Sequence, residues 1–253
     1  MTQDTLTSEA VIKLFKEIAS GNRESVMLND ELRRHLQDGS LGMMIHHPLM
    51  IEIGYAEQMN ELYNRRFDAI TEQCERLLRD KQYDSWIFRH ERPYRWEPLR
   101  HVRKLIKTDD DRREWWRLFA EVYIDTENWH QTPQRAWVTR WVNDDRRNHP
   151  ATLTAGIMND IDRATYDDMP DELTVYRGWN RDRGNVGWSW TLSRATANWF
   201  ATRFLIGPDK KKKAQVAIGR VNKSDVLAYW GGRKEDEVFV PFKAVQDIEI
   251  GAA

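Results

Sequence analysis

Hydrophobic positions in the first 150 or so residues recur at the spacing of an α-helix. Val11, Leu14, Phe15 and Ile18 stand at i, i+3, i+4 and i+7, which places them on one helix face. A stretch from about residue 49 to 78 contains few helix breakers and continues the same periodicity, at Ile53, Met59, Leu62, Phe67, Ile70 and Leu77. Helical patterns resume near 115–119 and 137–142, so residues 1–150 are predicted to form a helical region.

From Leu173 the pattern changes to short β-branched and aromatic runs separated by Gly, Asn, Asp and Lys, which is typical of strands. Strands are expected at 173–177, 188–192, 215–221, 226–229, 237–242 and 245–250. One helix, Arg194–Phe204, interrupts them, with Ser193 as its N-cap. The predicted fold class is therefore α+β, with a helical part at 1–150 and a mainly β domain at 151–253.

Composition narrows the function classes. The chain is 40% hydrophobic and 31% charged with a net charge of −1, and it has no apolar run long enough to span a bilayer. Its first residues lack the basic and apolar regions of a secretion signal, so we expect a cytoplasmic protein that makes no membrane contact. All seven histidines and the single cysteine lie before Pro150. Chemistry in the C-terminal part is thus expected to use carboxylates, hydroxyls and cations, with no metal site.

Three short segments carry the candidate chemistry. Arg177 ends an apolar strand and is followed by Gly178. In the next predicted strand, period-two alternation places Ser189 and Thr191 on the face opposite to the neighbouring tryptophans. Later in the chain, two glutamates flank Asp236, and in extended backbone they share one side while Asp236 points away. These glutamates are Glu235 and Glu237.

An aromatic-Arg-Gly strand, a Ser/Thr strand that leads into a helix, and a Glu-x-Glu that opens a late strand resemble, in this order, the R-S-E class of mono-ADP-ribosyltransferases. The helix around 197–201 and the strand at 225–229 resemble the phage and bacterial branch of that family. The resemblance covers about residues 172–250 and implies a split-sheet domain that uses NAD as a substrate. The chain departs from the usual Ser-Thr-Ser motif, because Trp190 stands in the middle. Ser189 matches the first serine, and Thr191 is the alternative.

The resemblance also implies residue roles. Glu237 would hydrogen-bond the ribose 2′-hydroxyl and stabilise the oxocarbenium-like cation that forms when the nicotinamide–ribose bond breaks. Glu235 would orient or deprotonate the incoming nucleophile. Arg177 would hold the pyrophosphate, and Ser189 would position Glu237 and the ribose. The residues expected to contact NAD are Arg177, Gly178, Ser189, Thr191 and Trp199, with Phe239 as an alternative to Trp199 for stacking on nicotinamide. The other interpretation of both rings is core packing.

The implied function is mono-ADP-ribosyl transfer to a macromolecule, either a protein arginine or a base in RNA or DNA. Two alternatives are an NAD glycohydrolase and a binding module that kept the fold without turnover. A cytoplasmic enzyme of this kind is expected to be a bacterial toxin, a phage-defence effector or a phage factor that reprogrammes its host, with a regulatory partner or antitoxin.

The region before residue 150 is expected to choose the target. Residues 86–117 interleave aromatic rings with Arg and Lys, a pattern typical of single-stranded nucleic-acid binding. The alternative is a set of amphipathic helices with a solvated Arg face and a buried aromatic face. The lysine run at 210–213 is expected to be a solvated loop or, alternatively, a phosphate contact.

Overall fold

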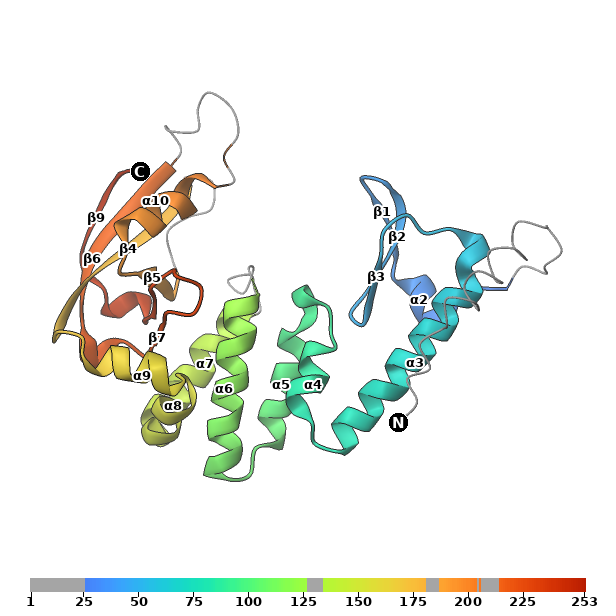
Figure 1. Cartoon of the computed structure of the whole chain (residues 1–253), viewed down its shortest axis with the longest axis horizontal. Helices are drawn as coiled ribbons and strands as arrows, with labels where there is room; N and C mark the ends of the chain where they lie inside the picture. The colour runs from blue at the N-terminus through green and yellow to red at the C-terminus, as the bar shows by residue number, and fades with distance from the viewer. Residues whose placement is uncertain (1–25, 127–133, 181–186, 204, 206–213) are drawn as a thin grey trace. The chain divides into compact units, whose positions relative to one another are not determined.

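The computed structural model describes residues 26–126, 134–180, 187–203, 205 and 214–253 (Figure 1). The predicted helix face at residues 11–18 and the lysine run at 210–213 lie outside these residues. The chain divides into two compact units, one ending at Pro98 and the other beginning at Leu99. Among the described residues, none of the helices combines the length and the apolarity needed to cross a membrane.

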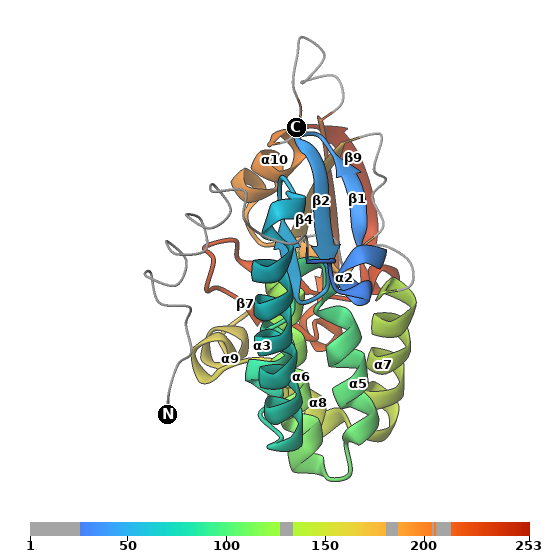
Figure 2. The same ribbon diagram turned by 90° about the vertical axis from the view of Figure 1, so that its right-hand side faces the viewer.

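The first unit contains a three-stranded antiparallel sheet with the order β1-β2-β3 (Figure 1). Figure 2 shows β1 and β2 side by side. Its described elements are α2 (Asp30–Arg34), β1 (Leu36–Gly39), β2 (Gly42–His47), β3 (Met50–Glu52), the 3-10 turn Glu57–Met59, α3 (Asn60–Arg79), α4 (Tyr83–Phe88) and the 3-10 turn Arg92–Tyr94. The prediction of an entirely helical region is therefore wrong for residues 36–52. Gly42 adopts a φ of 107°, which side chains disfavour, and this allows the tight reversal between β1 and β2.

Helix α3 supplies the apolar face that covers this small sheet. Its buried residues Tyr63, Phe67 and Ile70 follow the helical period, as the sequence predicts for Phe67 and Ile70. The rings of Tyr63 and Phe67 belong to one cluster with residues of α2, β2 and β3. Ile53 is 68% exposed, so the prediction that it shares this face is wrong, because the helix begins only at Asn60.

The second unit joins a set of helices to a six-stranded antiparallel sheet with the order β7-β8-β5-β4-β6-β9. Its helices are α5 (Trp96–Leu105, which begins before the boundary), α6 (Asp109–Asp125), α7 (Gln134–Asn148), α8 (Pro150–Gly156), α9 (Asp160–Asp167) and α10 (Arg194–Thr202). Its strands are β4 (Glu172–Asn180), β5 (Ser189–Thr191), β6 (Ala214–Asn222), β7 (Ala228–Trp230), β8 (Glu237–Phe239) and β9 (Gln246–Ala252), with 3-10 turns at Lys223–Asp225 and Phe242–Ala244. All six predicted strands and the helix after Ser193 are confirmed, and the fold class is α+β.

Strands β4 and β5 meet at the pair Tyr176 and Thr191, which links the halves β7-β8-β5 and β4-β6-β9. Helix α10 packs on β4 and β6, as Figure 1 shows. Gly178 makes this packing possible, because a Cβ at that position would lie 1.8 Å from the carbonyl oxygen of Ala197. The helix backbone therefore lies directly against the strand.

Helix α6 shares its aromatic core with the sheet. The ring of Tyr123 lies 4.9 Å from that of Phe239 and 5.2 Å from that of Trp230, between centroids, and Phe119 lies 5.8 Å from Phe239. The helices after Leu99 thus belong to the same compact unit as the strands. The division between Pro98 and Leu99 lies at a different place from the predicted boundary at 150/151. The assignment of target choice to residues 1–150 stays a prediction.

Candidate active site

Ser189, Thr191 and Glu237 lie on one face of two neighbouring strands. In the antiparallel register of β5 and β8, Thr191 pairs with Glu237 and Ser189 pairs with Phe239. Side chains two residues apart on a strand share a face, which brings the Ser189 hydroxyl to the Glu237 carboxyl. The Ser189 hydroxyl favours the ionised form of this carboxyl and so lowers the pKa of Glu237. The structure therefore brings together the serine and the second glutamate that the sequence singles out.

The Glu237 carboxyl titrates far from its ordinary range. Burial raises its pKa to about 7, and the charge of Glu235 acts in the same direction. The hydrogen bond from Ser189 and the charges of Arg233 and Arg177 oppose this rise, because they favour the ionised form. A carboxyl poised near neutral pH in an enclosed place is typical of a functional site.

Arg177 reaches the same place from β4. Its Nη1 donates to the carbonyl oxygen of Ser189, and burial lowers the pKa of the guanidinium. Its Nε is buried and has no hydrogen-bond partner among the described residues. A buried donor without a partner is costly. The predicted contact between Arg177 and a phosphate group stays a prediction.

Gly187 makes room for this guanidinium, a role that the sequence analysis did not assign. A Cβ at Gly187 would lie 2.4 Å from Nη2 and 2.6 Å from Cζ of Arg177. Any side chain there would displace the arginine. The signal in the sequence is a glycine two positions before the candidate serine, and it acquires its meaning only once β4 and β5 are seen to be neighbours.

Tyr123 is a second residue that sequence reasoning missed. It comes from the C-terminal end of α6, and its hydroxyl lies 2.5 Å from the Ser189 Oγ. Burial raises the pKa of Tyr123 well above its ordinary value, and the charge of Glu237 adds to this rise. No local pattern could have found it, because residues 123 and 189 meet only through tertiary packing.

Glu235 lies just before β8, and its side chain is 23% exposed. The Thr191 hydroxyl donates to the backbone carbonyl of Glu235 and so holds this segment. The Glu235 carboxylate lies 4.0 Å from Nε of Arg233. Asp236 adopts a φ of 45° and accepts a hydrogen bond from the hydroxyl of Tyr229, so its carboxylate has a partner of its own. Because of this positive φ at Asp236, and because β8 begins only at Glu237, the prediction that Glu235 and Glu237 share one side of an extended segment is wrong.

The remaining predicted residues lie elsewhere or have structural partners. Gly178 lies under α10, and the Thr191 hydroxyl also accepts from the backbone N–H of Ser193. Trp199 is 53% exposed on α10, and the guanidinium of Arg203 lies 5.0 Å from its ring. Phe239 is fully buried, so the alternative that it stacks on nicotinamide is wrong. Its ring is stacked with those of Trp188 and Trp230, at 5.2 Å and 5.5 Å.

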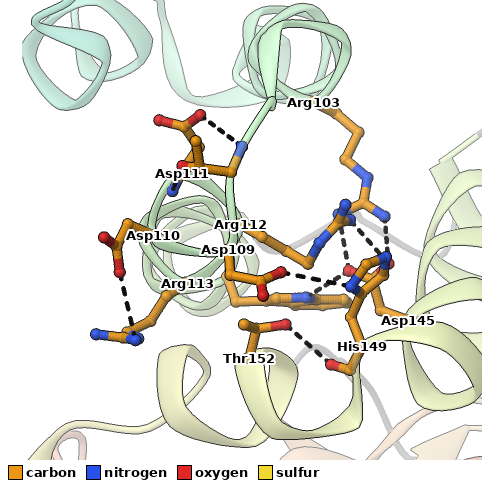
Figure 3. A network of polar contacts seen from close by, with 11 residues as sticks. Arg103, Asp109, Asp110, Asp111, Arg112, Arg113, Asp145, His149 and Thr152 are labelled. Carbon is orange, nitrogen blue, oxygen red and sulfur yellow. Dashed lines mark hydrogen bonds and ion pairs between the residues drawn. The ribbon is translucent and has the colours of Figure 1, made fainter.

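The part of the Trp- and Arg-rich segment that lies in the second unit is built into its core. Trp115 and Trp116 are fully buried. Arg103 donates to both carboxylate oxygens of Asp145, at 2.8 and 2.7 Å, and Arg112 donates to one of them at 3.1 Å (Figure 3). Aromatic rings in such positions cannot stack on nucleic-acid bases. At these positions the structure confirms the buried aromatic face of the amphipathic-helix alternative, but Arg103 and Arg112 are enclosed and not solvated.

Histidines gather in the first unit, where Glu31, His35 and His47 place their polar atoms within 4.8 Å of one another. The Nδ1 of His47 accepts the backbone N–H of Leu49 at 3.1 Å, so the proton of the neutral ring is on Nε2. That Nε2 faces the Glu31 carboxylate at 3.8 Å. Burial lowers the pKa of His47 to about 4, which keeps the ring neutral. This arrangement suits a polar contact between His47 and Glu31 better than metal ligation.

Comparison with known proteins adds no relative to this chain. No family model, no curated protein and no solved structure matches it.

Proposed function

We propose that the second unit is an NAD-dependent mono-ADP-ribosyltransferase domain whose active site contains Arg177, Ser189, Glu235 and Glu237. One observation carries this proposal: Ser189 and the half-buried Glu237 share a face of neighbouring strands, and the charge of Arg177 on β4 acts on the Glu237 carboxyl. These are the three residue types that the sequence resemblance pairs with NAD. They come from β4, β5 and β8, which are neighbours in the sheet.

Each of these residues has a role in ADP-ribosyl transfer that its surroundings favour. Arg177 would bind the pyrophosphate through its fork of guanidinium donors. Glu237, when ionised, would stabilise the positive charge that develops on the ribose as the C–N bond to nicotinamide breaks and its electron pair leaves with the nicotinamide. Glu235 would take the proton of the acceptor group as that group bonds to the ribose carbon. Its partial exposure suits contact with a macromolecular acceptor.

We propose that the acceptor is a protein arginine or a nucleic-acid base, and that the chain acts as a toxin, a phage-defence effector or a phage factor directed at its host. Burial of Trp115 and Trp116 removes one reason to expect a nucleic-acid surface on α6. It leaves a protein acceptor as the first candidate to test.

Labelled NAD incubated with the full chain and a cell lysate tests the proposal. The wild type should attach the label to a macromolecule, and digestion with protease or with nuclease should show which class carries it. Glu235→Ala should lose this labelling while it still releases nicotinamide, because Glu237 and Arg177 remain. Labelling by Glu237→Gln at the wild-type level would contradict the proposed roles.

A further inference from the structure

The helix α6 reaches the proposed active site through one polar group. Tyr123 is 3% exposed, and its hydroxyl is 2.5 Å from the Oγ of Ser189. Ser189 in turn shares a face of the β5–β8 pair with Glu237 and lowers the pKa of its carboxyl. The three side chains therefore follow one another from α6 through β5 to β8. The same end of α6 is held by Arg233, whose Nη1 donates to the carbonyl oxygen of Ile124.

We propose that Tyr123 is a positioning residue for the active site, and that its hydroxyl orients the hydroxyl of Ser189 so that Ser189 donates its proton to the Glu237 carboxylate. This inference rests on the proposed function and extends it to a residue outside the segment that resembles the transferase family. Helix α6 thereby contributes a positioning residue to the site.

Hydrogen-bond counting supports this direction of donation. A serine hydroxyl has one proton to donate and two lone pairs that accept. Tyr123 retains its proton at neutral pH, because burial and the charge of Glu237 raise its pKa. When Tyr123 donates to the Oγ of Ser189, the serine proton is left for Glu237. Chains of this kind polarise each bond in the enclosed interior, which strengthens the last bond to the carboxylate.

Other charged groups also act on these three side chains, and a variant that tests the proposal must leave their charges unchanged. Glu235 and Arg233 act on Glu237 from the segment before β8, and Arg177 acts on it from β4. Arg135 of α7 acts on Arg177. Tyr123→Phe alters none of these charges. It also keeps the ring that packs against Trp230 and Phe239.

In Tyr123→Phe the Ser189 hydroxyl is free to turn, so its bond to the ionised Glu237 weakens. We expect the pKa of Glu237 to rise by about half a unit to one unit, which corresponds to the net worth of one hydrogen bond. The acid limb of the pH profile of kcat should move up by the same amount, with KM for NAD changed less than about twofold, since uniform binding of the substrate is kept. Tyr166→Phe is the matched control, because the Tyr166 hydroxyl donates to the carbonyl of Lys223 at 2.9 Å, away from the three side chains.

The test is the titration of the glutamate carboxyl groups by ¹³C NMR in the full-length wild type, Tyr123→Phe, Ser189→Ala and their double variant. This measurement needs no turnover. A failure of the proposed function would appear as the absence of NAD cleavage by the wild type, whereas a failure of this inference would appear in the titration. The positioning role is supported if the pKa of Glu237 rises in Tyr123→Phe. In addition, the double variant should have the same Glu237 pKa as Ser189→Ala alone, because Tyr123 acts only through Ser189. A Glu237 titration that is the same in Tyr123→Phe, Tyr166→Phe and the wild type overturns it.

Discussion

Replacing Asp145 by asparagine should destabilise the second unit strongly, because this carboxylate is the centre of a buried charge network. Only 2% of the Asp145 side chain is exposed, and it accepts hydrogen bonds from Arg103 and Arg112 (Figure 3). It also accepts one from the indole nitrogen of Trp116. The two arginine side chains are themselves 14% and 18% exposed. A neutral amide in place of the carboxylate would leave two enclosed guanidinium groups without their counter-ion.

Removing one partner of a buried ion pair typically costs about 3–5 kcal/mol, since the remaining charge stays away from water. For a unit of this size each kcal/mol lowers Tm by about 2–4 °C, so the expected loss is about 6–20 °C. The network also has a pH dependence. Burial alone would raise the pKa of Asp145, but the hydrogen bonds and charges of Arg103, Trp116 and Arg112 outweigh it, and the pKa is lowered. Its stabilisation is therefore present above the unfolded pKa and is lost as pH falls through the folded one.

Asp144→Asn is the matched control, because it removes the same charge from the neighbouring position of α7. Asp144 is 57% exposed and lies 3.8 Å from Arg140, which is 82% exposed, so its loss should cost less than about 1 kcal/mol. Urea and thermal unfolding of both variants, followed by tryptophan fluorescence and circular dichroism, measure the difference. Equal stability of the Asp145→Asn and Asp144→Asn proteins would refute the role given to this network.

Three further predictions follow from the sheet. Because burial raises the pKa of Glu237 to about 7, the native state keeps a proton that the unfolded chain releases nearer to pH 4.5. The free energy of unfolding should therefore fall as pH rises through this window. Urea unfolding of Glu237→Gln should lack this contribution to the pH dependence. Gly178→Ala should prevent α10 from packing on β4, since its Cβ would overlap the backbone of Ala197, and a thermal unfolding curve at the wild-type Tm would contradict this. Gly187→Ala should displace the Arg177 guanidinium and weaken NAD binding by calorimetry with little change in secondary structure, and unchanged affinity would exclude Arg177 from the pyrophosphate contact.

Local sequence patterns were sufficient for the strands of the second unit. Alternation over residues 188–192 predicts that Ser189 and Thr191 share a face, and the register of β5 and β8 confirms it. The N-cap at Ser193 is also confirmed, as its side chain accepts from the backbone N–H of Thr196. These features depend on neighbours a few residues away, which a sequence displays directly.

Features that depend on tertiary packing were missed. Tyr123 is one aromatic residue among several in α6, and only the docking of that helix brings its hydroxyl to Ser189. The hairpin at residues 36–47 was taken for helix because β2 is short and its few apolar residues fit either period.

The most direct test of the central proposal is the release of nicotinamide from NAD by the purified full-length chain, measured for the wild type, Glu237→Gln and Glu249→Gln. Glu249 is exposed on β9 and provides the charge-matched control. The wild type and Glu249→Gln should release nicotinamide at the same rate, with a rate that rises as pH increases through about 7, where Glu237 ionises. Glu237→Gln should be slower by about a hundredfold or more, because an amide cannot stabilise the developing cation. Release by folded Glu237→Gln at the wild-type rate would contradict the assignment of Glu237 as the catalytic carboxylate.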